Sequence, residues 1–299
     1  QTNPFHKPAM CLQKDRAIAS QACEKDWFAC AMGARHISGG RERKIGFPEG
    51  EMNSSRWIGS FIAASAAAFF VSVSAAPASA QSAPESSANK PVLVELFLSQ
   101  SCPMCPPAAE LFPSYAARDD VVALTWHVDY WNMTTSPKGV WEDPFSKAAY
   151  TDRQKQYNMN IRQRSSIYTP QIIVNGEYQT VGANAAKIDA LLVDAQTTTP
   201  LRAEADGDSV IFAVGESETG GNAYLVTFYK QATTDVTGGK NAGKAFTTRH
   251  VVKDVQPMGL VRKRGGEITA PRPADGEGCA LLIQEPGQKR VIAAAYCRS

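Results

Sequence analysis

The stretch LFLSQSCPMCPPAAELF, residues 96–112, contains the side chains best suited to chemistry in this chain. An apolar run ends in small polar residues, and Cys102 and Cys105 follow with two residues between them. Two cysteines at this spacing can form a redox pair, half of a metal site or a structural disulfide. The function of the chain depends on which of these the pair is.

A redox role requires a thiolate, because the thiolate and not the thiol attacks a disulfide. A cysteine at a helix N-terminus meets unpaired N–H groups and the positive end of the dipole, which stabilise that thiolate. We expect Cys102 to be exposed and to attack, and Cys105 to face inward and resolve the mixed disulfide. Pro106 and Pro107 fit only a first helical turn, which indicates a helix start at Cys105 rather than at Cys102.

Residues 52–80 have the pattern of a secretory signal peptide. Arg56 supplies positive charge, an apolar run follows, and Ala-Ser-Ala at 78–80 matches a cleavage motif. We expect an exported protein, periplasmic or secreted, without membrane association after cleavage. A retained membrane anchor is the alternative, although the run falls short of the roughly 20 strongly apolar residues of a spanning helix. Residues 1–51 are interpreted as an upstream extension or a disordered leader, and 81–90 as a linker.

Export affects how the cysteines are interpreted. Four cysteines follow residue 81, and an even number in an oxidising compartment favours two disulfides. Spacing favours the pairs Cys102–Cys105 and Cys279–Cys297. A hairpin that turns near residues 286–288 places Cys279 opposite Cys297, which suits a structural disulfide. A redox relay between this pair and Cys102 is the alternative.

Composition limits the class of protein. The chain has 299 residues, a net charge of +2, 43% hydrophobic and 20% charged residues, which suits one large or two ordinary domains. There is no concentrated basic face for nucleic acid and no Gly-rich phosphate loop. We therefore expect no cofactor and no nucleic-acid partner, and we assign no metal ligands.

The first half of the exported part predicts an α/β domain, residues 91–199. The runs PVLVELFL (91–98) and VVALTWHVD (121–129) are continuously apolar, as in strands of a parallel sheet, with a helix between them. A helical insert is predicted over 143–164, with Asp143 as its N-cap and Pro144 at its first position. Asn175-Gly176 predicts a hairpin, and a helix follows it.

The texture changes after Pro200. Short strand-like runs such as SVIFAVG, AYLVTFYK and RVIAAAY alternate with Gly, Pro and polar turns. This pattern predicts a small all-β, sandwich-like second domain over residues 200–299. We expect it to position a substrate or to dock a partner.

The order of these elements resembles the thioredoxin fold with a helical insert, as in periplasmic disulfide oxidoreductases. The segments VELFLSQSCPMCPPA, HVDYWN, WEDPF, YTPQIIVNG and KNAGKAFTTRHVV resemble more closely a secreted bacterial family, the domain of unknown function 1223 family. This resemblance covers about residues 91–297. It implies a thioredoxin-like fold, and it implies no settled activity, because the family has none.

The resemblance also implies roles for three further residues. Glu95 would be a buried proton acceptor for Cys105, its pKa raised by burial, or else a carboxylate paired with a neighbouring polar group. Thr169-Pro170 would be a cis-proline loop beside the cysteines, whose backbone offers an edge to an extended substrate. An ordinary trans proline is the alternative.

Other polar and aromatic residues have two interpretations each. His127 could join the cysteines as a metal ligand, but the ligand set is short and a hydrogen-bonded strand histidine is favoured. Arg153 is interpreted as part of a solvated helix face. Four aromatic residues either line a groove beside the cysteines or belong to the core: Trp126, Tyr130, Trp131 and Trp141.

The sequence therefore predicts an exported thiol-disulfide oxidoreductase. Cys102 attacks, Cys105 resolves, Glu95 manages the proton, and Thr169-Pro170 positions a secreted or periplasmic partner that carries thiols or disulfides. The alternative is a non-catalytic binding module with a structural Cys102–Cys105 disulfide. A third hypothesis is a copper-delivery protein.

Overall fold

The computed structural model describes residues 90–297. The predicted signal peptide, the upstream extension and nearly all of the linker lie outside the described residues. Within 90–297, no helix is long and apolar enough to cross a membrane.

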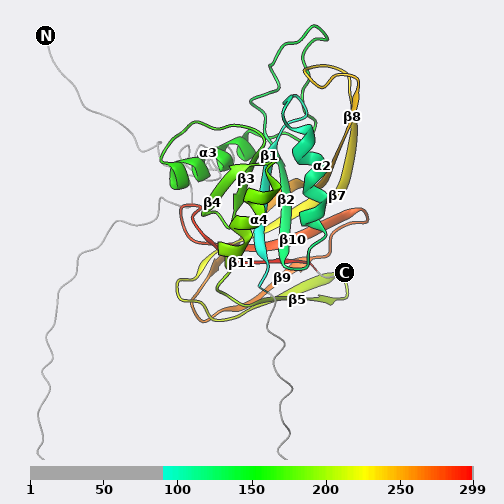
Figure 1. The fold of residues 1–299 in the computed structure, drawn as a ribbon. Helices are drawn as coiled ribbons and strands as arrows, with labels where there is room; N and C mark the ends of the chain where they lie inside the picture. The colour runs from blue at the N-terminus through cyan, green and yellow to red at the C-terminus, as the bar shows by residue number, and fades with distance from the viewer. Residues whose placement is uncertain (1–89, 298–299) are drawn as a thin grey trace, which may run out of the picture. The chain divides into compact units, whose positions relative to one another are not determined.

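Eight strands form one mixed sheet in the order β11-β10-β7-β8-β2-β1-β3-β4, and three strands form a second sheet in the order β5-β6-β9 (Figure 1). The large sheet contains β1 (Val92–Leu98), β2 (Val121–His127), β3 (Gln171–Val174), β4 (Tyr178–Val181), β7 (Gly221–Val236), β8 (Lys244–Val261), β10 (Glu277–Gln284) and β11 (Val291–Tyr296). The small sheet contains β5 (Leu201–Asp206), β6 (Ser209–Val214) and β9 (Gly266–Pro271). The helices are α2 (Pro106–Ala116), α3 (Ala148–Arg162) and α4 (Ala185–Asp194).

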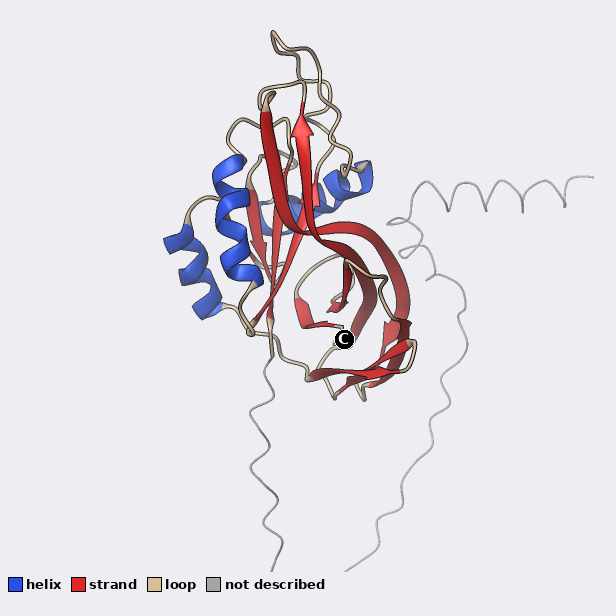
Figure 2. Ribbon diagram, turned by 90° about the vertical axis from the view of Figure 1, so that its right-hand side faces the viewer, coloured by secondary structure: helices blue, strands red, loops and turns tan. Residues whose placement is uncertain are grey.

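Strand β1 lies in the interior of the large sheet. It pairs in parallel with β2 and antiparallel with β3, and all seven of its residues are buried. Because side chains alternate along a strand, successive residues of β1 enter different cores. Val94, Leu96 and Leu98 pack with α2 and α4, whereas Leu93 and Phe97 pack with α3. Helices on both faces explain why the run is almost wholly apolar (Figure 2).

The small sheet packs on a different part of the large one. Its strands share a core with β7, β10 and β11, built around Phe212, Leu225 and Leu281. The long strands β7 and β8 curve toward this core, as Figure 2 shows. Cys279 and Cys297 form a disulfide at its edge, with Cα atoms 5.2 Å apart, so the predicted structural pair is confirmed.

The predicted fold class is wrong. The described chain is mostly β, with one large mixed sheet and three short helices, rather than a thioredoxin-like α/β domain with a helical insert followed by a separate sandwich. Strands from both predicted domains join the same sheet, because β8 pairs in parallel with β2 at Thr125 and Val251. The backbone edge of β2 is satisfied by a segment more than a hundred residues away, and the Thr125 hydroxyl donates to the Arg249 carbonyl oxygen at 2.7 Å.

Two local predictions have different outcomes. Asn175 and Gly176 have positive φ values of 49° and 73° and form the predicted turn between β3 and β4. The predicted helix start at Asp143 is wrong, since α3 begins at Ala148 with Lys147 as its N-cap. Asp143 is buried and binds elsewhere in the fold, as described below.

Candidate functional site

The two central cysteines lie at the junction of β1 and α2. Cys105 is the N-cap of α2, and Pro106 is its first residue, as the prolines predict. The Cys105 N–H donates to the Cys102 carbonyl oxygen at 3.3 Å, which closes a tight turn between them. Cys102 and Cys105 are free thiols in this structure, whereas their spacing predicts a disulfide between them.

Both thiols are buried, so the expected exposure of Cys102 is wrong. Cys102 and Cys105 have 0% relative exposure and belong to the core that α2 covers. Met104, between them, is 68% exposed. The turn thus presents its two intervening residues to solvent and keeps both sulfur atoms inside.

The pKa values of the two thiols are shifted in opposite directions. The pKa of Cys102 is lowered to about 7, mainly by a hydrogen bond from the Cys105 thiol, although burial acts in the opposite direction. The Thr169 hydroxyl and the backbone N–H groups of Met104 and Cys105 lower it further. Burial and the neighbouring Cys102 sulfur raise the pKa of Cys105 well above its usual value. Cys102 is therefore the thiol of the pair that ionises more readily.

The Thr169-Pro170 peptide bond is cis, as predicted, and lies beside the cysteines. The Cys102 Sγ and the Thr169 carbonyl oxygen are 3.7 Å apart. Trp131 fixes Thr169 by donating from its indole Nε1 to the threonine hydroxyl at 2.7 Å. Gly182 donates its N–H to the Pro170 carbonyl oxygen at 2.9 Å, and a Cβ on Gly182 would come within 2.9 Å of the Pro170 ring.

Gln100 anchors the loop that leads to the cysteines. It is fully buried, and all four of its polar groups are hydrogen-bonded. Its N–H donates to Asp143 Oδ2 (2.8 Å), its carbonyl accepts from Asn241 Nδ2 (2.8 Å), its Oε1 accepts from Trp141 Nε1 (3.0 Å), and its Nε2 donates to Thr234 Oγ1 (3.1 Å). Three segments distant in sequence, residues 141–143, Thr234 and Asn241, therefore hold this loop in place.

Asp143 ties the loop to His127. Its Oδ2 is 2.7 Å from His127 Nδ1, and both side chains are fully buried. Burial opposes ionisation, but His127 and the N–H groups of Gln100 and Phe145 lower the pKa of Asp143. His127 is thus the hydrogen-bonded strand histidine that we favoured. Within 90–297, no group of three or more His, Cys, Asp and Glu side chains could hold a metal ion.

The structure does not bring Glu95 to the cysteines. Glu95 lies on the face of β1 that packs against α3, whereas Cys102 and Cys105 lie on the α2 side. Its Oε1 accepts from Arg153 Nε at 2.8 Å and its Oε2 accepts from the Tyr157 hydroxyl at 2.6 Å. The alternative interpretation of Glu95, a carboxylate paired with neighbouring polar groups, fits this arrangement.

Arg153 is buried rather than part of a solvated face, so that expectation is wrong. Its guanidinium lies over the Trp126 ring, 4.8 Å from the centroid, and donates to the Tyr157 hydroxyl at 2.7 Å. Although burial opposes it, the Glu95 carboxylate raises the pKa of Arg153. This buried ion pair belongs to the core rather than to a reactive site.

The four aromatic residues divide between core and site. Trp126 is buried in the core on the α3 side. Trp131 and Trp141 are partly buried and pack against the cluster that contains the cysteines. Tyr130 is 37% exposed, and burial of its hydroxyl raises the pKa above its usual value. Three of the four therefore lie near the dithiol.

Sequence reasoning missed Gln100 and Asn241. Both stand in segments singled out for family resemblance, VELFLSQSCPMCPPA and KNAGKAFTTRHVV. The available signal was a polar residue in each segment without an assigned role. Their contact depends on the pairing of β7 with β8, which local patterns do not predict.

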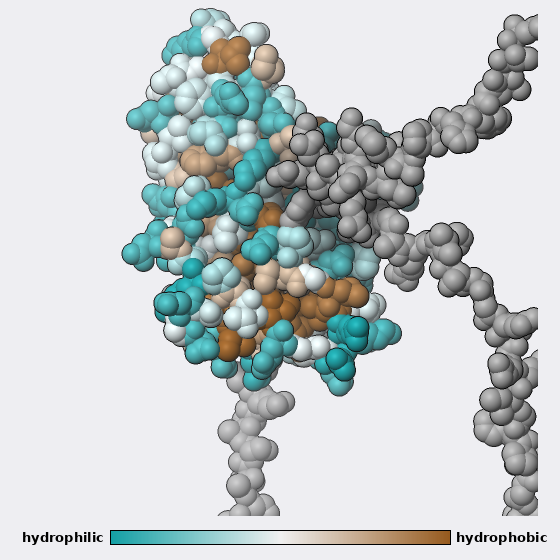
Figure 3. All heavy atoms as spheres, turned by 180° about the vertical axis from the view of Figure 1, so that it is seen from behind, coloured by the Kyte–Doolittle hydropathy of each residue, from teal (hydrophilic) through white to brown (hydrophobic). Residues whose placement is uncertain are grey.

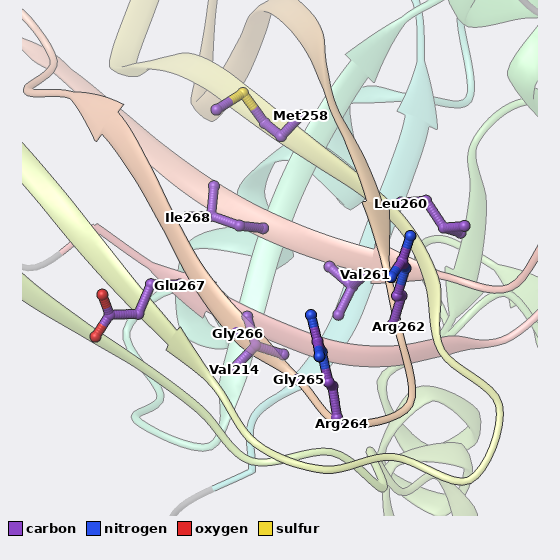
Figure 4. A pocket seen from close by; sticks show the side chains of 10 residues that line it. All are labelled: Val214, Met258, Leu260, Val261, Arg262, Arg264, Gly265, Gly266, Glu267 and Ile268. Carbon is purple, nitrogen blue, oxygen red and sulfur yellow. The ribbon is translucent and has the colours of Figure 1, made fainter.

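A cavity of about 270 Å³ lies between the end of β8 and β9 (Figure 4). Apolar side chains, including Met258, Val261 and Ile268, share its lining with Arg262 and Arg264. Seen from behind, this lower part of the fold also carries an apolar surface area with polar side chains around it (Figure 3). The residues that line the cavity include one carboxylate, Glu267, and no cysteine, serine or histidine.

Comparisons with known proteins match the predicted family. The model of a family described as protein of unknown function (DUF1223) matches residues 93–284. A crystal structure of an Agrobacterium tumefaciens protein, a structural genomics target, has 28% identity and a TM-score of 0.59, and covers 69% of this chain and 93% of its own. HBP35 of Porphyromonas gingivalis has 13% identity and a TM-score of 0.49, with 69% and 74% coverage, a similarity too low to inform the function. No curated protein matches.

Proposed function

We propose that this chain, which belongs to the DUF1223 family of proteins of unknown function, exchanges thiols and disulfides with other exported proteins through Cys102 and Cys105. One observation carries the proposal: two free thiols within a single turn have pKa values shifted in opposite directions. A pair that only staples the loop has no need of this asymmetry. An attacking and a resolving cysteine do need it.

The reduced pair would act in two steps. The Cys102 thiolate attacks one sulfur of a substrate disulfide, a Cys102–substrate bond forms, and the other substrate sulfur leaves as a thiolate that takes up a proton. Cys105 then loses its proton, attacks Cys102 Sγ and releases the second substrate thiolate, which is protonated in turn. The substrate gains two electrons and two protons, and the protein is left with a Cys102–Cys105 disulfide. The reverse sequence oxidises a substrate dithiol.

The second step becomes easier once the first is complete. The charge and hydrogen bond of Cys102 are among the causes that raise the pKa of Cys105. The mixed disulfide removes the negative charge from Cys102, so this cause disappears when Cys105 must ionise. Glu95 lies on the other face of β1 and cannot accept the proton that Cys105 loses. That proton goes to the leaving substrate thiolate or to water.

The Thr169-Pro170 loop would hold the substrate. The Thr169 carbonyl oxygen is already 3.7 Å from Cys102 Sγ, and Trp131 fixes the same residue through its hydroxyl. An extended substrate chain paired with this backbone would bring its disulfide toward Cys102. Export rests on the predicted signal peptide, and the proposed partners are periplasmic or secreted proteins with thiols or disulfides.

A second candidate function is a non-catalytic binding module. The complete burial of Cys102 favours it, because in-line attack requires an open approach to the sulfur. Under the oxidoreductase proposal, the exposed Met104 side of the turn must open when substrate binds.

A redox titration of the full chain separates the two candidates. The protein is equilibrated in graded glutathione buffers, trapped with an alkylating agent and read by peptide mass. We expect Cys102–Cys105 to titrate with a midpoint between about −120 and −270 mV, the range of known exchange proteins, while Cys279–Cys297 stays closed. Cys102→Ser is the control and leaves Cys105 alkylated throughout. A pair that stays oxidised below about −300 mV contradicts the proposal and supports the binding module.

A further inference from the structure

The hairpin of β7 and β8 extends past the rest of the sheet (Figure 1). We call residues 237–243, between these strands, the arm tip. Val236 and Phe246, on either side of the arm tip, pack in the same cluster as Cys102 and Cys105. A part of the chain that the sequence assigned to another domain therefore covers the dithiol.

The arm tip is attached to the loop between β2 and α3. The Gly239 N–H donates to the Gly139 carbonyl oxygen at 3.2 Å, and the Ser136 hydroxyl donates to the Gly239 carbonyl oxygen at 2.9 Å. A Cβ on Gly239 would come within 3.0 Å of Trp141 and 3.2 Å of the Ser101 hydroxyl, and its φ is +69°. The tip lies so close to the loop that bears Cys102 that only a glycine fits at position 239.

Asn241 makes the decisive contacts. It is 1% exposed, and its side-chain Nδ2 donates to the carbonyl oxygens of Gln100 and Cys102, at 2.8 Å each. Both N–H bonds of the amide are thus used on two carbonyls that flank Ser101. The Cys102 carbonyl also accepts the N–H that closes the turn to Cys105.

We propose that Asn241 is a positioning residue for the dithiol: from the arm tip it holds the backbone turn in the geometry in which Cys102 Sγ receives its hydrogen bonds. Thr234, on β7 below the tip, assists by accepting from the Gln100 side chain. The thiolate is stabilised by groups of the same turn, namely the Cys105 thiol and two backbone N–H groups. Without the two hydrogen bonds from Asn241, these donors can move away from the sulfur, and the thiolate becomes less stable.

This inference deepens the proposed function and rests on it for its biological meaning, but its test does not require turnover. The test variant is Asn241→Ala in the full, reduced chain. The thiolate of Cys102 is followed by its ultraviolet absorbance against pH, with Cys102→Ser as the blank. We expect the titration midpoint to rise by about one pH unit from its value near 7. A merely structural role for Asn241 would lower the unfolding midpoint and leave the titration unchanged.

Two more variants control the experiment. Thr237→Ala changes an exposed residue of the same arm tip and should leave the titration midpoint unchanged. Thr234→Val removes only the hydroxyl bound to Gln100 and should raise the midpoint by a smaller amount. If Asn241→Ala fails to fold, Thr234→Val carries the test, and an unchanged midpoint in that variant overturns the inference.

The outcomes separate the inference from the proposed function. If the wild-type pair does not titrate in glutathione buffers but Asn241→Ala raises the thiolate midpoint, the positioning role stands and the exchange function fails. If the pair does titrate and Asn241→Ala leaves the thiolate midpoint and the redox midpoint unchanged, the exchange function stands and the inference is overturned.

Discussion

The two faces of strand β1 bury polar groups in opposite ways. On the α3 face, the Glu95 carboxylate is paired with Arg153 and accepts from the Tyr157 hydroxyl, so its charge is fully partnered. On the α2 face, past the end of the strand, Cys102 and Cys105 share weak sulfur hydrogen bonds inside an apolar cluster. One face contains an ion pair, and the other contains two thiols whose pKa values are shifted in opposite directions.

This difference separates stability from reactivity within one strand. The Glu95 carboxylate and the Arg153 guanidinium depend on each other, because removing either one would leave the other buried without a counter-charge. A thiol pair held mainly by backbone geometry is easily perturbed, because small movements change its hydrogen bonds. Substitutions on the α3 face should therefore change stability alone, and substitutions around the cysteines should also change thiol titration.

The largest expected effect comes from Arg153→Met. The substitution leaves Glu95 buried without its cation and should lower the free energy of unfolding by about 3–5 kcal/mol. Urea unfolding followed by tryptophan fluorescence measures the loss. The double variant with Glu95→Gln is the control and should recover part of it, because no unpaired charge remains. The thiolate titration of Cys102 should not change, and a shift there would break the separation of the two faces.

A smaller effect is expected from Asp143→Asn, on the cysteine side. The carboxylate accepts from the Gln100 N–H at 2.8 Å and pairs with His127, so its loss should cost about 1.5–3 kcal/mol. The pKa of Asp143 is lowered in the folded state, so its stabilising contribution is present above the ordinary carboxyl pKa of 3.8 and is lost as pH falls through the folded value. The full cost therefore applies at pH 7.

The measurement for Asp143→Asn combines urea unfolding with the thiolate titration. We expect the Cys102 midpoint to rise, because the loop that bears Gln100 loosens. Asp152→Asn, which removes an exposed carboxylate paired with Lys155, should change neither quantity. Destabilisation without any change in the titration would show that only the arm tip, and not Asp143, positions the thiols.

Local patterns predicted elements better than their assembly. The buried strands, the Asn175-Gly176 turn and the helix start after Cys105 follow from residue types within a few positions of each other. The fold class failed because the partner of the β2 edge is β8, far along the chain, and strand propensity does not identify a partner. A helix start was also misplaced, because Asp143 can cap a helix but here binds Gln100 and His127.

The site was predicted in part for the same reason. Cys102, Cys105 and the cis peptide at Thr169-Pro170 are recognisable from short motifs. Glu95 was linked to the cysteines because it interrupts an apolar strand near them, but a strand buried on both faces does not reveal which face each residue occupies. Asn241 was invisible because its role exists only once the hairpin of β7 and β8 is formed.

The smallest effect concerns the cysteine face alone and is measured as a dependence on pH. The pKa of Cys102 is lowered to about 7 from 9.0, so an ionised Cys102 stabilises the folded, reduced protein. A depressed acid contributes fully above the unfolded pKa and loses its contribution as pH falls through the folded pKa. Relative to Cys102→Ser, the reduced wild type should gain stability between about pH 7 and pH 9, by roughly 1–2 kcal/mol after allowance for the coupled Cys105.

Urea unfolding of both reduced proteins at several pH values measures this gain. Cys105→Ala is the matched control, because it removes the thiol whose hydrogen bond is the largest cause of the lowered Cys102 pKa. If the difference from Cys102→Ser is the same at pH 7 and pH 9, Cys102 titrates as an ordinary thiol. The two faces of β1 would then differ only in composition, and the asymmetry on which thiol exchange rests would be lost.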